Sequence, residues 1–74
     1  MNEDLLQMQF GSHLREKRDK LGLSQEALAN EAGLHRTYVS AVERGRRNPT
    51  LVSLSRLAKA LGISVSELLV GVGQ

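Results

Sequence analysis

Three arginines within four positions form the most concentrated charge in the sequence. Arg44, Arg46 and Arg47 follow one another closely, and no acidic residue comes after them until Glu67. The whole chain carries a net charge of only +2, so the cluster is local rather than part of a general excess. Positive charge gathered in one place favours an anionic partner. The charges alone leave a solvated basic loop open as the alternative.

The side chains that enzymes and metal sites use are scarce. The chain has no cysteine, which excludes disulfides and thiolate-bound metals. His13 and His35 stand far apart, without the spacing of a metal-ligand pair. We find no Ser/His/Asp set at a plausible spacing and no glycine-rich phosphate loop. We therefore expect no catalytic residue, no metal ion, no cofactor and no small-molecule ligand, and we predict that the protein is not an enzyme.

The 74 residues of the chain suit one domain over positions 1–74. Phe10 and Tyr38 are its only aromatic residues, so Leu, Val, Ile and Ala have to form the core. The acidic amino end is unlike a secretory signal and no apolar run is long enough to span a membrane, so we expect a cytoplasmic protein. A small domain without cross-links is often stabilised by oligomerisation, which favours a homodimer.

Apolar spacing and glycine punctuation predict five short helices. No segment of four or more residues alternates with period two, so we expect an all-α fold. The predicted helices cover about 4–20, 25–32, 36–44, 51–61 and 65–70, with a loose tail at 71–74. Two inward stripes are expected, one of Leu6, Phe10, Leu14 and Leu21 and one of Leu54, Leu57, Ala58 and Leu61.

Capping residues mark the ends of these helices. Ser24 and Thr50 are predicted N-caps, because short side chains with an oxygen accept the free amide hydrogens of a first turn. Ser64 and Glu67 have the spacing of a capping box. Gly33 ends the helix before it, since glycine adopts a positive φ at little cost.

Residues 24–44 have the pattern of a helix-turn-helix. Two short helices meet at Gly33 without room for a longer loop, and the small Ala29 stands where they must cross. The apolar residues that would hold the second helix on the first are Leu28, Ala32, Leu34, Val39 and Val42. In this arrangement the second helix is presented to the major groove of DNA.

An ordered series of short motifs covers about residues 10–70. It comprises Leu14-Arg15…Arg18, Gly22-Leu23-Ser24-Gln25…Leu28-Ala29, Ala32-Gly33-Leu34, Val39-Ser40…Glu43-Arg44-Gly45…Asn48-Pro49 and Leu54…Leu57-Ala58…Leu61-Gly62-Ile63-Ser64. This series resembles the phage-repressor (Cro/C1) type of helix-turn-helix protein, and the stretches 34–40 and 43–48 are most similar to the controller proteins of restriction–modification systems. The resemblance implies a compact five-helix repressor-like domain. His35 departs from the family, which usually has Ser, Thr or Asp as the cap of the third helix.

The third helix is predicted to turn a small, polar, basic face outward. On a helical wheel this face lies opposite Val39 and Val42. The predicted base readers are Arg36, Thr37, Ser40 and Arg47, the last because controller-type members of the family use that loop arginine in this way. The predicted contacts to the DNA backbone are Ser24, Gln25, Tyr38, Arg44, Arg46 and Asn48. For Tyr38 the alternative is packing against the second helix.

Arg18 and Glu43 are predicted to form a structural ion pair. Both fall near the inward side of their helices, and a buried charge without a partner is unfavourable by several kcal/mol. The family often pairs these two positions. The pair would hold the third helix at its angle.

The function that these features favour is a sequence-specific DNA-binding transcription regulator. We expect a homodimer on a pseudo-palindromic operator, since one recognition helix reads too little sequence alone. Val52, Val65 and Leu69 are the predicted dimer interface, with the core or a scattered surface as the alternative. Double-stranded DNA is the expected partner, with RNA polymerase as a further candidate. The competing interpretation is an antitoxin or phage-type regulator whose main partner is another protein.

Overall fold

The structure, a computed structural model, describes residues 2–74 and forms five helices in that range. They are α1 (Glu3–Lys20), α2 (Gln25–Ala32), α3 (Arg36–Glu43), α4 (Leu51–Leu61) and α5 (Val65–Leu68). No strand occurs between residues 2 and 74, so the all-α prediction is confirmed. The predicted ends of α3 and α5 were too far along the chain, since α3 stops before Arg44 and α5 before Leu69.

Side-chain caps fix where most of these helices begin. The side-chain oxygens of Ser24, Thr50 and Ser64 accept hydrogen bonds from the first-turn amides of α2, α4 and α5. Asn2 does the same for α1, with its Oδ1 2.8 Å from the Leu5 amide nitrogen. His35 makes no capping hydrogen bond. The first amides of α3 are therefore left without a side-chain partner from its N-cap.

A core of aliphatic side chains joins the helices. Its fully buried members are Leu14, Leu28, Leu57, Leu68, Val39 and Val42. Two members of the stripe predicted for α1 lie outside it, because Leu6 is 41% and Leu21 56% exposed. Leu21 is already beyond the last helical residue, where the chain turns away at Gly22. Leu6 borders a surface groove instead of facing another helix.

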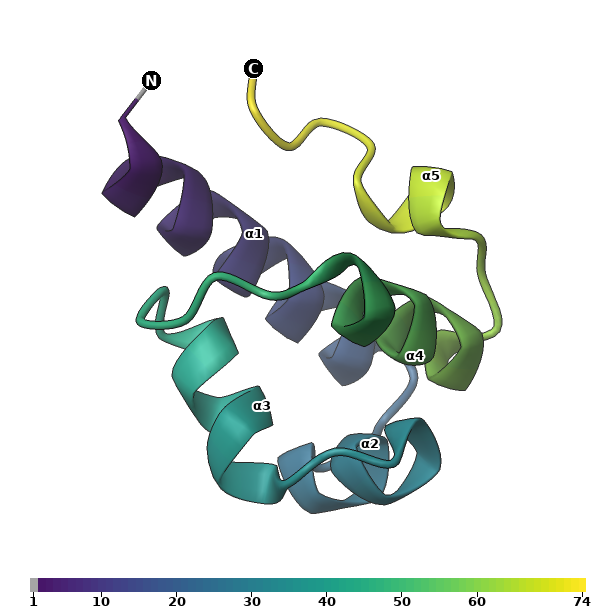
Figure 1. Cartoon of the computed structure of the whole chain (residues 1–74). Coiled ribbons are helices and arrows are strands. Elements are labelled where there is room, and N and C mark those ends of the chain that lie inside the picture. The colour runs from purple at the N-terminus through teal and green to yellow at the C-terminus, as the bar shows by residue number, and fades with distance from the viewer. Residues whose placement is uncertain (1) are drawn as a thin grey trace.

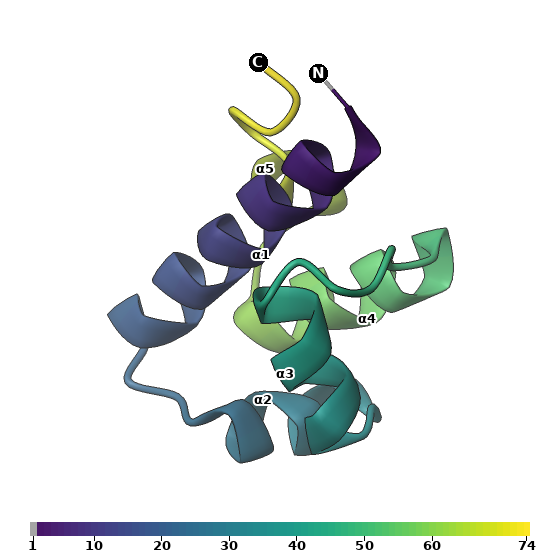
Figure 2. The ribbon, with the colours of Figure 1, turned by 90° about the vertical axis from the view of Figure 1, so that its left-hand side faces the viewer.

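A glycine allows α1 to cross close to the end of α3. Gly11 is buried, and a Cβ atom placed on it would clash with the backbone carbonyl oxygens of Val42 and Glu43. Figure 2 shows α3 lying below α1 while α2 and α4 flank it. The position of α3 is thus set by backbone contact with α1 as well as by side-chain packing.

The carboxyl-terminal residues, which the sequence predicts as a loose tail, have contacts with α1. The Gly73 amide donates a hydrogen bond of 2.6 Å to Oε1 of Gln9. Val72 is half-buried and packs on the core. Apolar contact and the hydrogen bond from the Gly73 amide to the Gln9 side chain hold the tail, so the carboxyl-terminal residues lie at the same end of the molecule as the start of α1 (Figure 1). No helix in the described part of the chain is long and apolar enough to cross a membrane.

Candidate nucleic-acid interface

The solvent-facing side of α3 brings together three of the predicted DNA contacts. Arg36, Thr37 and Arg44 are exposed, whereas Val39 and Val42 on the opposite side are completely buried. Because the turns of α3 repeat every 3.6 residues, this burial fixes which side chains point outward. The outward face offers guanidinium and hydroxyl donors, which suit the base edges and phosphates of a groove.

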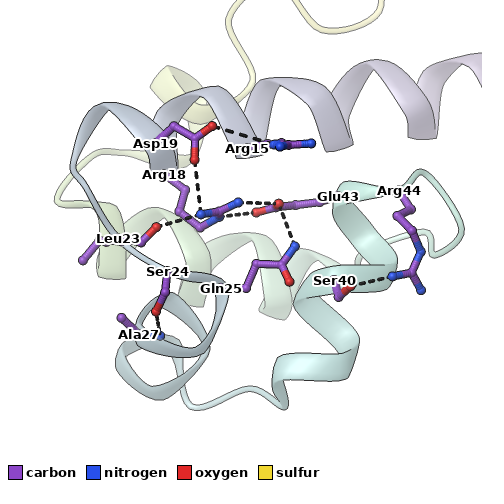
Figure 3. Close-up of polar contacts among 10 residues, drawn as sticks. All are labelled: Arg15, Arg18, Asp19, Leu23, Ser24, Gln25, Ala27, Ser40, Glu43 and Arg44. Atoms are coloured by element: carbon purple, nitrogen blue, oxygen red, sulfur yellow. Dashed lines mark hydrogen bonds and ion pairs between the residues drawn. The ribbon is translucent and has the colours of Figure 1, made fainter.

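Ser40 and Arg44 are one helical turn apart and already interact with each other. Arg44 donates from Nη1 to Oγ of Ser40, as Figure 3 shows. Ser40 is only half-exposed. The predicted base reader and the predicted backbone contact therefore form one polar unit in this structure.

The turn after α3 determines where the side chains of the following loop lie. Gly45 has a φ of 76°, the left-handed conformation that glycine adopts without strain. The Gly45 amide donates to the Val42 carbonyl at 3.0 Å and the Arg46 amide to the Ala41 carbonyl at 2.9 Å. This hydrogen-bond pair is a Schellman motif. It ends α3 and leaves the side chains of Arg46 and Asn48 exposed beside it.

Arg47 lies over the ring of Tyr38. Its guanidinium carbon is 5.3 Å from the ring centroid, a cation–π distance. Tyr38 is half-buried against the core, and its hydroxyl donates a 3.1 Å hydrogen bond to Oγ of Ser53 on α4. The alternative prediction, that Tyr38 packs against α2, is supported in part. The ring is half-buried, but its hydroxyl has its hydrogen-bond partner on α4 and not on α2. Its ring has a packing role, and it also orients a predicted base reader.

Arg18 and Glu43, the two residues expected to pair, form a bidentate ion pair. Arg18 donates from Nε to Oε2 at 2.7 Å and from Nη2 to Oε1 at 2.9 Å (Figure 3). Its third nitrogen, Nη1, donates to the Leu23 carbonyl at 2.7 Å. The hydrogen bonds to Glu43 are the main cause that raises the pKa of the Arg18 guanidinium above its ordinary value.

Gln25 extends this pair to the helix-turn-helix. Its Nε2 donates to Oε1 of Glu43 at 3.0 Å, so the first residue of α2 is tied to the last residue of α3. The neighbouring Ser24 accepts from the Ala27 amide at 3.0 Å and keeps its own hydroxyl proton free to donate. Both residues, predicted to contact the DNA backbone, therefore stand at the start of α2 in fixed orientations.

Comparison with known proteins identifies the family. The HTH_3 model, described as helix-turn-helix, matches residues 14–68. The chain belongs to this Cro/C1-type helix-turn-helix family. It is a DNA-binding transcription regulator and not an enzyme.

Similar proteins include several controllers of restriction–modification systems. The regulator is 52% identical over 64 residues to control protein C.SmaI of Serratia marcescens, covering 86% of this chain and 76% of that one. It is 45% identical over 65 residues to C.BamHI of Bacillus amyloliquefaciens, covering 86% and 80%. The crystal structure of the controller C.AhdI from Aeromonas hydrophila superposes with a TM-score of 0.82 at 53% identity, covering 84% and 94%.

The predicted dimer residues of the regulator do not form one exposed patch. Val52 is 63% exposed, but Val65 and Leu69 are half-buried and pack on the core. Leu69 also lies beyond the end of α5, where it borders the groove with Pro49 and Leu54. Val65 and Leu69 thus fit the alternative interpretation as core residues. Val52 is the most exposed of the three and the best candidate for contact with a second copy.

Two exposed apolar residues of the regulator escaped the sequence prediction. Leu51 is 75% and Val70 67% exposed. Leu51 stands three residues before Leu54 but was not part of the stripe predicted for this helix, which begins at Leu54. Only the structure shows that the Leu51 side chain, at the start of α4, is exposed.

Among residues 2–74 no group of three His, Cys, Asp or Glu side chains could hold a metal ion.

Proposed function

We propose that this transcription regulator binds a pseudo-palindromic operator as a homodimer and controls a restriction–modification system. The observation that carries the proposal is the outward face of α3, where Arg36 and Thr37 are exposed opposite two completely buried valines. The loop arginines stand at one end of this face. Relatives that are 45–53% identical bear the names of control or controller proteins.

Base readout is assigned to four residues. Arg36, at the start of α3, can present its planar fork to the O6 and N7 atoms of guanine. Thr37 offers a hydroxyl and a methyl group, the latter to a thymine. Ser40 allows close approach, and Arg47 reaches past the end of the helix from its place over Tyr38.

Phosphate contacts flank this face. The start of α2 provides Ser24 and Gln25, and backbone amides at a helix N-terminus attract anions. The end of α3 and the following loop provide the remaining contacts, which are Arg44, Arg46, Asn48 and the edge of Tyr38. Contacts of this kind set register and affinity but carry no base preference themselves.

A dimer is supported by size and by the exposed apolar side chains. Half-sites of a two-fold operator lie roughly 34 Å apart, one helical turn of DNA. The domain measures 31 × 23 × 22 Å, so two copies side by side span such a site. Val52 with Leu51 on α4, and Leu69 with Val70 after α5, supply apolar surface for the contact. Val65, the third predicted interface residue, is half-buried and packs on the core.

Selection from a randomised duplex library tests the proposal. We expect enriched sequences with two-fold symmetry and half-sites about one helical turn apart. Enrichment of asymmetric sequences, or of none, contradicts it. A pull-down that returns a stoichiometric small protein, together with failure to bind any duplex, supports the antitoxin or phage-type alternative. Genes for a methyltransferase and an endonuclease beside this one identify a restriction–modification controller.

RNA polymerase is the further partner proposed for this regulator in the cytoplasm. A dimer bound beside a promoter either assists or obstructs the polymerase, depending on where the operator lies. Transcription in vitro from a template carrying the selected operator, at rising regulator concentration, separates these outcomes. An unchanged transcript level at full operator occupancy contradicts an effect on the polymerase.

A further inference from the structure

A chain of hydroxyl groups connects α4 to the side of α3 that faces DNA. Oγ of Ser53 accepts a hydrogen bond from the Tyr38 hydroxyl at 3.1 Å and another from Oγ1 of Thr50 at 3.1 Å. Thr50 is itself held, because its Oγ1 accepts from the Ser53 backbone amide at 3.0 Å as the cap of α4. Ser53 is therefore fixed at both its backbone and its side chain.

Counted as whole residues, Ser53 and Arg18 are the only polar or charged residues of 2–74 that are buried, and the side chain of Glu43 is buried as well. The residue exposure of Ser53 is 8%, like that of Arg18, whose charge is satisfied by Glu43. Buried hydroxyl groups are favourable only when they are hydrogen-bonded. The capping residue Thr50 uses both the amide and the hydroxyl oxygen of Ser53, and the further hydrogen bond from Tyr38 is the one that joins this cap to α3.

The other end of the chain is the arginine in the loop after α3. Arg47 is exposed and would sample many rotamers on its own, yet its guanidinium lies over the Tyr38 ring. The ring keeps one orientation because its hydroxyl is anchored on α4. The stack thus gives Arg47 a fixed starting position before any DNA arrives.

We propose that Ser53 is a positioning residue for DNA recognition, which sets the base preference of Arg47 through the Tyr38 ring. The inference rests on the proposed function, since it assumes that Arg47 reads a base. Ser53 itself touches no DNA, because it is buried beneath Tyr38. Its removal lowers the base preference at the position that Arg47 reads and leaves the positions read by Arg36 and Thr37 unchanged.

Base-preference profiles of three variants test this relay. Ser53→Ala removes the acceptor but keeps the amide that Thr50 caps. Tyr38→Phe removes the donor and keeps the ring. We expect each to reduce preference at one base position about threefold to tenfold, which lies in the lower part of the range of coupling between residues in one hydrogen-bond network. The double variant should be no worse than either single one. Ser55→Ala, an exposed serine on the same helix, is the matched control and should retain the full preference.

Epistasis with Arg47 separates positioning from a general structural effect. In an Arg47→Ala background the Ser53→Ala change should leave the base profile as it was. Ser53→Thr keeps a hydroxyl and should restore the wild-type profile. Equal loss at every base position, or the same further loss in the Arg47→Ala background, overturns the proposal.

A measurement without DNA distinguishes failure of the relay from failure of the proposed function. The Arg47 side-chain protons over the Tyr38 ring should show an upfield ring-current shift in the NMR spectrum of the free protein. Ser53→Ala and Tyr38→Phe should reduce that shift, and Ser55→Ala should not. Arg47 resonances that are identical in wild type and Ser53→Ala overturn the relay, whether or not the protein binds a duplex.

Discussion

Arg18 of α1 and Glu43 of α3, 25 positions apart in the sequence, share hydrogen bonds of 2.7 and 2.9 Å. Their side chains are only 10% and 3% exposed. Gln25 joins the same carboxylate from the start of α2. One buried carboxylate therefore fixes three helices relative to each other, including both helices of the helix-turn-helix. The orientation of the DNA-facing side of α3 depends on this pair.

Breaking the pair should destabilise the fold. Glu43→Gln removes the buried counter-charge of Arg18 and leaves only the exposed Asp19 carboxylate, 3.2 Å from Nη1, so we expect a loss of about 3–5 kcal/mol in the free energy of unfolding. Urea unfolding followed by circular dichroism measures it. The control is Glu16→Gln, which breaks an exposed pair with Lys20 whose side chains are 65% and 70% exposed and should lose less than about 1 kcal/mol. Equal losses in the two variants contradict a special role for Glu43.

Arg36→Ala should change base preference and not only affinity. Losing a bidentate guanine contact reduces binding by roughly 1–3 kcal/mol at one position and flattens preference there. Competition binding against duplexes with single base changes gives the profile. Arg46→Ala, also an exposed arginine, serves as comparison and should weaken all duplexes about equally. Identical profiles for wild type and Arg36→Ala show that Arg36 is not a reader.

DNA affinity should depend strongly on salt. Counting the contacts of Gln25, Arg44 and Arg46 in each protomer gives about six in the dimer, so the logarithm of the binding constant should fall against the logarithm of salt concentration with a slope of about −5. Arg46→Ala removes one contact from each protomer and should make the slope shallower by about 2. Lys59→Ala removes an exposed lysine of α4 that is not among the proposed DNA contacts, and it should leave the slope near that of wild type. A slope close to zero in the wild type argues against phosphate binding.

Val52→Glu should give a folded monomer. Val52 is 63% exposed, so a carboxylate there remains hydrated in the monomer but would be buried between two copies. Sedimentation should show loss of the dimer, while circular dichroism stays helical and binding to the full palindrome falls. This variant is more informative than Leu69→Glu, because Leu69 packs on the core and its change also destabilises the fold.

Leu21→Glu is the matched control for the dimer. Leu21 directly follows α1 and is 56% exposed. Its change to Glu therefore removes a similar apolar surface outside the proposed contact. We expect it to dimerise like wild type. A dimeric Val52→Glu, or a wild type that stays monomeric both at high concentration and on DNA, shows that the interface lies elsewhere.

The sequence alone determined where most helices begin and end, and which residues of α3 face outward. Ser24, Thr50 and Ser64 cap the helices that follow them, and Gly33 ends the one before it. These features could be predicted because a cap or a left-handed turn depends on neighbours within a few residues. The outward face followed from period 3.6 and two valines.

Apart from the Arg18–Glu43 pair, only the tertiary structure decided which distant residues meet. The hydroxyl of Tyr38 finds Ser53 on α4, and Arg47 then lies over its ring. The tail contacts Gln9 on α1. Leu51 stays exposed although it stands three residues before Leu54. Periodicity reports which side of a helix is apolar, but whether another element covers that side depends on how all the helices pack, and such contacts join residues far apart in the chain.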